Sequence, residues 1–422
     1  MTDVSDLTRE QLNRPGVETE TGTGLYKLPR DHAHHGGLAY AGAEYQESVY
    51  FTALGIDKKT GDPYSVFFCP TVNGYTEKYG RPWWTTLFAV VDIKRKVFHQ
   101  CVHGHPGPIT TKGSGPEVPD KDFWYDYLVD GSAIDGSSTS LSYKADGEVW
   151  RWTSKVPNPN IAVPNDAYEM DVTGTVAAPG YFTPLVTGLT LEGAPAKGHD
   201  QHFANSLTGY GLSYYINVAN MPLTGRVKCK DIDIEFEGVA WQEHQWGNYR
   251  NEDYLQGLYH WGYVRFDDGV IASWRSFYDK TSSKENTELN RWVTIYPDGR
   301  IRYFNGSDAF TYEVTRIFTS PSTGIEHPVE GYINTPLGRF FCKTLIDNQE
   351  AQTLNKAGLW EGVKYWHKDG PDGPVVGRSF AEHCWAPNPP GGMDLPYRPE
   401  LRRKLDGGYP VLEDAVKKYL NF

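Results

Sequence analysis

Short apolar segments alternate with turn-forming residues along most of this chain. The segment Ser48–Leu54 is followed by the turn-rich loop Asp57–Pro63 and then by a second apolar segment, Tyr64–Cys69. Branched and aromatic residues in such runs favour strands, whereas Gly, Pro and Asp between them favour turns. Dipeptides typical of tight hairpins, in which Gly readily takes a positive φ, occur at Asp146-Gly147, Asp268-Gly269, Asp298-Gly299 and Asn305-Gly306.

The same pattern predicts many further strands and little helix. Strands are expected at Thr85–Val91, Lys96–Val102, Glu148–Thr153, Tyr168–Thr175, Gly211–Val218, Asp231–Gly238, Gly257–Phe266, Val270–Tyr278, Arg291–Tyr296, Thr311–Phe318 and Gly338–Leu345. Helical spacing of apolar residues occurs near the end of the chain, and a short exposed helix is expected at Asp6–Asn13. Many short strands with hairpin turns predict an all-β protein made of barrels or sandwiches, and their number favours two β units.

Size and composition narrow the class of protein. The chain has 422 residues, 39% of them hydrophobic, and a mean hydropathy of -0.55, which fits a globular protein with a large core. Its net charge of -12 without a basic block argues against nucleic acid and anionic membranes as partners. No run approaches the roughly 18 apolar residues of a membrane span. The polar start and five scattered cysteines without a C-x-x-C pair predict a cytoplasmic protein.

The stretch Val239–Gly247, with the sequence VAWQEHQWG, concentrates chemistry in a few positions. On a strand, Trp241 and Glu243 point to one face, and His244 and Trp246 point to the other. Histidine has the unperturbed pKa nearest neutrality, and an aromatic wall beside it desolvates a substrate or stabilises a cation. The stretch is therefore a candidate proton-transfer site. The alternative is a pair of core tryptophans beside a histidine that is satisfied by the backbone.

Three separated blocks of sequence are similar to one protein family. They are ESVYFTAL at 47–54, YYIN at 214–217 followed by MPLTG at 221–225, and GVAWQEHQWG at 238–247, with YHW at 259–261 before DDG at 267–269. Together they resemble the AttH-like/hydroxyneurosporene synthase (carotenoid 1,2-hydratase) family over roughly residues 30 to 400.

The resemblance implies an all-β fold of two lipocalin-like antiparallel barrels side by side, to which the sequence adds a short C-terminal helix. We expect an N-terminal extension at 1–30, a first domain at 31–235, a second at 236–400 and the helix at 401–422. The resemblance also implies a ligand site within or between the barrels, and chemistry on apolar, isoprenoid or polyketide-like molecules. Relatives differ in reaction, from alkene hydration to pericyclic ring closure, so the fold alone does not choose between them.

The resemblance also implies roles for individual residues. His244 and Trp246 match one functional pair of the family, and Tyr259 matches the aromatic residue of a second pair. His260 stands where that second pair has an acid. Acid-catalysed hydration would then need Glu243, Glu47 or Asp267 as the acid, or a cationic His260. The alternative for Tyr259 and His260 is an ordinary strand with alternating faces.

Other residues complete the predicted site. Trp241 and Trp261 would form an aromatic wall with Trp246, and Glu47, Tyr50 and Tyr215 would contact the substrate. A buried Glu47 would need a partner, so a structural pairing with an arginine or an indole N–H is an equally open interpretation.

Neither a metal nor a cofactor is expected. His32, His34 and His35 lie close together, but a metal needs three or four converging ligands, so a polar loop or a lid is the preferred interpretation. The pairs His103/His105 and His199/His202 are interpreted as loops beside Gly or Pro. The sequence has no H-E-x-x-H, G-x-S-x-G, G-x-G-x-x-G or P-loop motif, which argues against zinc proteases, serine hydrolases, dinucleotide-binding dehydrogenases and nucleotide hydrolases.

Three functions remain open at this point. The leading hypothesis is a cofactor-independent lyase (hydratase or dehydratase) or isomerase acting on a C=C bond of an apolar terpenoid- or polyketide-like small molecule, with His244 as acid, base or positioning group. The second is a non-catalytic binding protein for an apolar ligand. The third is a pericyclase that only shapes its ligand. The expected partner is the small-molecule substrate, and the chain is expected to be a monomer or a homodimer.

Overall fold

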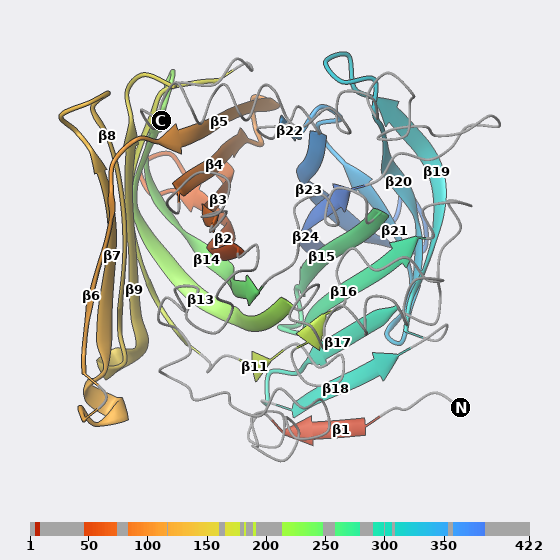
Figure 1. Cartoon of the computed structure of the whole chain (residues 1–422). Helices are drawn as coiled ribbons and strands as arrows, with labels where there is room; N and C mark the ends of the chain where they lie inside the picture. Colours follow the sequence, from red (N-terminus) through yellow and green to blue (C-terminus); the bar gives the residue numbers. More distant parts are fainter. Residues whose placement is uncertain are drawn as a thin grey trace. The chain divides into compact units, whose positions relative to one another are not determined.

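The computed structural model describes residues 5–8, 46–73, 83–115, 117–159, 165–177, 181–182, 189–190, 213–247, 258–278, 290–298, 300–305, 309–352 and 358–384. Within these ranges the regular structure is almost entirely β-strand, with two short 3-10 helices, η2 (Asp120–Asp122) and η3 (Asp146–Glu148). The strands form two antiparallel sheets, each in its own unit of the chain (Figure 1). The predicted all-β class is confirmed.

Unit 2 holds a curled sheet of 13 strands in the order β5-β4-β3-β2-β14-β13-β10-β9-β8-β7-β6, with β11 and β12 paired to β13. The strands are β2 (Gln46–Asp57), β3 (Pro63–Asn73), β4 (Trp83–Asp92), β5 (Val97–His105), β6 (Ile109–Gly113), β7 (Trp124–Gly131), β8 (Ser137–Lys144), β9 (Val149–Val156), β10 (Tyr168–Thr175), β11 (Tyr181–Phe182), β12 (Leu189–Thr190), β13 (Ser213–Cys229) and β14 (Ile232–Gly247). The long strands β13 and β14 bend along their length, and their register shifts between Val218 and Met221 (Figure 1).

Unit 1 holds a curled sheet of 11 strands in the order β1-β18-β17-β16-β15-β24-β23-β21-β20-β19, with β22 paired to β23. The strands are β1 (Ser5–Thr8), β15 (Leu258–Phe266), β16 (Ile271–Tyr278), β17 (Arg291–Ile295), β18 (Arg300–Asn305), β19 (Thr311–Thr319), β20 (Glu326–Thr335), β21 (Gly338–Thr344), β22 (Glu350–Gln352), β23 (Gly358–Lys368) and β24 (Val375–Cys384).

Alternation of side chains gives each sheet its buried face. Strand β7 alternates exposed and buried residues along its whole length, so that Tyr125, Tyr127 and Val129 point inward. In unit 1, small residues make room for large indoles. A Cβ atom placed on Gly262 would lie 2.3 Å from Cζ2 of Trp274, which is itself fully buried. Each unit thus packs an aromatic core against the inner face of its own sheet.

The predicted strands all occur, and the structure adds others. Strand β8 was missed because its sequence SSTSLSYK is mostly polar, although every second residue faces the core. The helix expected at Asp6–Asn13 was wrong for the part that the structure describes, since Ser5–Thr8 forms strand β1 and pairs with β18. The C-terminal helix expected at 401–422 lies outside the described residues.

The change from one sheet to the other falls between β14 and β15. Strand β14 pairs with β2 and with β13 along its length and so lies wholly in the sheet of unit 2. The expected boundary between 235 and 236 falls inside this strand, which is the one that carries the signature stretch. Strand β1, from the expected N-terminal extension, joins the sheet of unit 1.

Candidate functional site

The signature stretch is the second half of strand β14, next to strand β2. His244 lies opposite Val49 in the register, and Glu243 lies opposite Tyr50. Because directly opposed residues of an antiparallel pair share a face, His244 and Glu243 belong to different faces of this strand pair. The predicted alternation of the stretch is therefore present in the structure.

On the inner face of unit 2, an imidazole meets a carboxylate. Nε2 of His244 lies 2.7 Å from Oε1 of Glu47, although 197 positions separate the two residues in the chain. The side chain of His244 is fully buried and that of Glu47 is 3% exposed. At this distance a buried acid and a buried base share a proton in a strong, charge-assisted hydrogen bond.

Glu47 also borders a hollow inside the unit. The hollow is small, with a cavity volume of about 10 Å³, which is room for about one water molecule. Its lining comes from strands β2, β3, β4, β7 and β8, and consists of Glu47, Val49, Pro70, Val72, Trp84, Tyr125, Tyr127 and Leu141. His244 is not among the lining residues, so Glu47 lies between the imidazole and the hollow.

Aromatic side chains form one wall of this hollow. The rings of Trp84 and Tyr127 pack with their centroids 4.3 Å apart. The hydroxyl of Tyr125 and Nε1 of Trp84 are buried and have no hydrogen-bond partner among the described residues. Burial, and then the charge of Glu47, raise the pKa of Tyr125 well above its usual value, so its hydroxyl stays protonated. Both groups are therefore available as donors to an oxygen atom of a ligand.

The opposite face of the same strand pair holds a closed polar cluster. Nε1 of Trp241 donates a hydrogen bond of 2.7 Å to Oε1 of Glu243, and the hydroxyl of Tyr50 donates to Oε2. All three side chains are buried. Trp241, Glu243 and Tyr50 are thus brought together as predicted site residues, but they do not share a face with His244. Trp241 consequently forms no aromatic wall beside that imidazole.

His260 and Trp261 lie on strand β15, in the sheet of unit 1. The imidazole of His260 stacks on that of His383 with the centroids 4.0 Å apart, and Trp261 points to the opposite face. Burial, and then the charge of Lys364, lower the pKa of His260 well below its usual value. A lowered pKa disfavours the cationic form of His260, which was one of the candidate acids.

Asp267 lies at the surface of unit 1, where it is 56% exposed and pairs with Arg378 at 3.1 Å. The backbones of Trp246, Tyr215 and Tyr259 lie in strands β14, β13 and β15, and Trp246 is opposite Glu47 in the register, but their side chains lie outside the description.

Among the described residues, no group of three or more His, Cys, Asp or Glu side chains is arranged to hold a metal ion. The cluster His32, His34 and His35 lies outside the described residues, as do His199 and His202. His103 and His105, which were expected in a loop, are instead buried on strand β5. Over the same described ranges, no helix has the length and apolar character required to cross a membrane.

Sequence reasoning missed several residues that border or resemble the site. Tyr125 and Tyr127 could have been found from the alternation of WYDYLVDG on strand β7. His383 could have been found because residues 382–385, Glu-His-Cys-Trp, repeat the Glu-His-x-Trp pattern of residues 243–246. His383 occupies in strand β24 the place that His244 occupies in strand β14.

Comparisons with known proteins agree with this description. The family model described as AttH-like matches residues 183–382, which confirms the resemblance to that family. A crystal structure assigned to AttH from Nitrosomonas europaea has 16% identity and a TM-score of 0.60, and the alignment covers 85% of this chain and 96% of that one. Kievitone hydratase from Nectria haematococca has 14% identity and a TM-score of 0.51, over 82% of this chain and 92% of that one. A search of curated proteins finds no match.

These likenesses concern the fold. The double lipocalin-like architecture expected from the sequence is confirmed, with one curled antiparallel sheet in each unit. At these identities the arrangement of side chains has to be taken from this chain itself.

Proposed function

We propose that this chain, with its AttH-like segment at 183–382, is a cofactor-independent acid–base catalyst of a C=C bond in an apolar small molecule, either a hydratase (or dehydratase) or an isomerase. The observation that carries the proposal is the buried pair of Glu47 and His244, joined at 2.7 Å, with Glu47 facing a hollow lined by aromatic rings. A proton donor at the edge of an apolar hollow is what the protonation of an alkene requires, and the hollow would have to widen to admit a substrate.

The pair of Glu47 and His244 suggests a sequence of proton transfers in which every proton is accounted for. The pair of Glu47 and His244 gives its shared proton, through Glu47, to one alkene carbon, and the other carbon becomes cationic. In hydration, a water oxygen bonds to the cationic carbon and its surplus proton returns to the pair of Glu47 and His244. In isomerisation, the pair instead removes a proton from a neighbouring carbon. His244 acts as a positioning residue that holds and exchanges the proton.

The lining of the hollow suits such a reaction. The faces of Trp84 and Tyr127 are electron-rich and stabilise a developing cation. The unpartnered hydroxyl of Tyr125 and Nε1 of Trp84 favour a substrate that carries an oxygen acceptor on its apolar body. The fold is compatible with such chemistry, since the similar structure from Nectria haematococca is named as a hydratase.

Two carboxylates on the same strand pair give a matched test. Glu47→Gln removes the acid on the inner face, and Glu243→Gln removes the one on the opposite face. Both variants and the wild type would be incubated with a panel of terpenoid and aromatic alkenes in ¹⁸O-labelled water. Mass spectrometry would measure the masses of the products. We expect turnover to fall by about 10²- to 10⁴-fold in Glu47→Gln alone, since general acid–base catalysis contributes factors of that size.

Each outcome of this test has a meaning. Labelled oxygen in the product identifies hydration, and an unlabelled isomer identifies a proton shift. A cyclised, unlabelled product that forms equally fast in Glu47→Gln contradicts the proposal and favours the pericyclase. Tight binding of a ligand that never changes favours the binding protein. Loss of turnover in Glu243→Gln with an active Glu47→Gln would move the site to the opposite face.

A further inference from the structure

A row of polar side chains crosses the inner face of unit 1. Ser276 on β16 lies opposite His260 on β15, and His260 lies opposite His383 on β24. The next member of the row is Trp360 on β23, which lies opposite His383. Directly opposed residues share a face, so these side chains project together into the core. Ser276, His260 and His383 are at most 1% exposed.

The hydrogen bonds of the two imidazoles fix where their protons lie. The indole Nε1 of Trp274 can only donate, and it lies 3.4 Å from Nε2 of His260. The ammonium of Lys364 also only donates, and it lies 2.8 Å from Nε2 of His383. Both Nε2 atoms therefore accept, which assigns a proton to both Nδ1 atoms.

These two Nδ1–H groups have nothing to donate to. Among the residues that the structure describes, neither Nδ1 of His260 nor Nδ1 of His383 has a hydrogen-bond partner, and the same holds for the hydroxyl of Ser276. A buried donor without an acceptor costs about 1–3 kcal/mol. Three such groups in one cross-strand row indicate that an acceptor from outside the protein completes them.

Lys364 adds a positive charge to the row. Its side chain is 1% exposed, and its ammonium donates to the carbonyl of Pro328 at 2.8 Å and lies 3.4 Å from the hydroxyl of Tyr312. The rings of Trp360 and Tyr312 lie 5.0 and 5.4 Å from this ammonium. Burial lowers the pKa of Lys364 to about 8, so the group still carries a proton near neutral pH.

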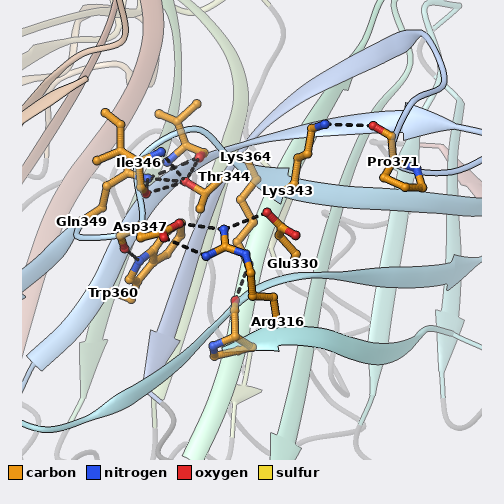
Figure 2. A network of polar contacts seen from close by, with 12 residues as sticks. Arg316, Glu330, Lys343, Thr344, Ile346, Asp347, Gln349, Trp360, Lys364 and Pro371 are labelled. Atoms are coloured by element: carbon orange, nitrogen blue, oxygen red, sulfur yellow. Dashed lines mark hydrogen bonds and ion pairs between the residues drawn. The ribbon is translucent and has the colours of Figure 1, made fainter. Parts of the chain in front are cut away.

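Neighbouring carboxylates do not neutralise this charge. Arg316 donates to Glu330 at 2.7 Å and also donates to Asp347 (Figure 2). Glu350 accepts hydrogen bonds from Ser320 and Thr323 and pairs with His327. No carboxylate of the described residues lies within ion-pair distance of Lys364. A buried cation without a counter-charge is costly, and an anion beside it would offset that cost.

We propose that unit 1 carries a second ligand site, in which His260, His383 and Ser276 donate to the carboxylate of a small organic acid and the buried charge of Lys364 stabilises it. The two oxygens of a carboxylate accept from several donors at once and supply the missing negative charge. The aromatic rings around the row favour a carboxylate attached to an apolar body, because Tyr312, Trp274 and Phe310 have their centroids 5.0 to 5.9 Å from that of His260. Its residues belong to unit 1, whereas the pair of Glu47 and His244 belongs to unit 2.

The test uses the full-length chain and benzoate as the probe. Isothermal titration calorimetry would measure the binding of sodium benzoate, of neutral benzamide, of chloride and of phosphate. We expect one benzoate site, no measurable benzamide site, and weaker binding of benzoate above the pKa of Lys364 than below it. Equal binding of benzamide, or displacement of benzoate by chloride or phosphate at the same concentration, would overturn the assignment to an organic carboxylate.

Variants locate the probe. Lys364→Met should weaken benzoate binding by at least about tenfold, because the buried positive charge that stabilises the carboxylate is lost, whereas Lys343→Met should not change it. Lys343 is a suitable control because it lies on the neighbouring strand β21 and its exposed ammonium donates to the carbonyl of Pro371 (Figure 2). Unchanged affinity in Lys364→Met would contradict the proposal.

A second pair of variants guards against misfolding of Lys364→Met. Ser276→Ala and His260→Phe each remove one donor of the row without removing the charge. We expect benzoate affinity to fall about two- to tenfold in each, the effect of losing one hydrogen bond. Circular dichroism would establish that each variant is folded. If folded Ser276→Ala and His260→Phe both bind benzoate as tightly as the wild type, the row does not bind the carboxylate.

Discussion

Strands β14 and β24 carry the same pattern of residues in two different sheets. Residues 243–246 and 382–385 both read Glu-His-x-Trp, and in each strand the histidine faces the inside of its own unit while the glutamate faces the other way. Each strand also lies between two antiparallel neighbours, β2 and β13 in one unit and β15 and β23 in the other. The local structure around the two histidines is therefore alike.

Their neighbours give the two histidines different chemistry. In unit 2, His244 lies opposite Val49 and pairs with a carboxylate, Glu47. In unit 1, His383 lies opposite a second histidine and accepts from an ammonium, Lys364. An acidic partner makes a proton-sharing pair, whereas a basic partner makes a row of donors that lacks an acceptor. The chemistry of this motif is thus decided by the strands beside it.

One pair of corresponding core positions differs in charge between the two units. Ala240 and Ser379 each precede their histidine by four positions, and the residues opposite them are Met221 on β13 and Lys364 on β23. Methionine leaves the core of unit 2 apolar at this place. Lysine puts a charge into the core of unit 1, which only an anion or a loss of the proton can offset.

The largest expected effect is on turnover, and it should differ between variants of His244 and of His383. His244→Gln should lower turnover of an accepted alkene by about 10²- to 10⁴-fold, because it disturbs the proton shared with Glu47. His383→Gln should leave turnover within about threefold of the wild type and weaken benzoate binding instead, by up to about tenfold. Initial rates and calorimetry on the same preparations would measure both. Equal losses of activity in the two variants would show that the two histidines do not differ in function.

The next effect concerns the indole beside His383. Trp360 is fully buried, packs on His383 with a centroid distance of 5.2 Å, and donates to the carbonyl of Asp347 at 2.8 Å. Trp360→Ala should reduce the free energy of unfolding by about 3–5 kcal/mol, because it leaves a cavity in the core. Urea denaturation would measure the loss, and hydrogen exchange should show it in β23 and β24 before β2 and β14. A loss below about 1 kcal/mol would show that the core closes around the gap.

A third prediction concerns the stability of the fold at acidic pH. Burial, followed by the charges of His260, Lys364 and His327, lowers the pKa of His383 well below its usual value, and the pKa of His260 is lowered in the same way. Unfolded histidines titrate near pH 6.5, so below about pH 6.5 the unfolded chain binds more protons than the folded one and stability falls.

The measurement for this prediction is the melting temperature as a function of pH. Unit 2 contributes to the slope through His105, whose pKa is also lowered by burial, so the comparison must be with a variant. His260→Phe should flatten the slope between about pH 6.5 and pH 5 relative to the wild type. An unchanged slope would mean that His260 takes up its proton in the folded state as easily as in the unfolded one.

The smallest expected effect contrasts two buried hydroxyls. Thr139 in unit 2 bonds to Nε2 of His105 at 3.1 Å and to the hydroxyl of Ser154 at 2.7 Å, whereas the hydroxyl of Ser276 in unit 1 has no partner among the described residues. Thr139→Val should cost about 1–3 kcal/mol of stability, whereas Ser276→Ala should leave stability unchanged or raise it by up to about 1–3 kcal/mol, because it removes an unpaired buried donor. Chemical denaturation would decide between them. Equal costs would imply that Ser276 has a partner in solution.

Much of the local structure could be predicted from the sequence. The turn dipeptides and the apolar runs located strands β2, β3, β15 and β16, and the alternation within VAWQEHQWG placed Glu243 and His244 on opposite faces. The polar strand β8 was missed because its inward residues are mostly Ser, Thr and Tyr, so hydrophobicity carries no signal there. His103 and His105 were misassigned to a loop because neighbouring Gly and Pro suggested a turn.

The sequence by itself determined which residues of a strand share a face, because alternation is a property of the extended backbone and needs no neighbour. Only the tertiary structure decided what each face meets. Glu47 reaches His244 across 197 positions, and the ammonium of Lys364 reaches His383 on the next strand, because the order of strands in each sheet brings these segments together. Such pairings depend on long-range closure of the sheet, which no local pattern encodes.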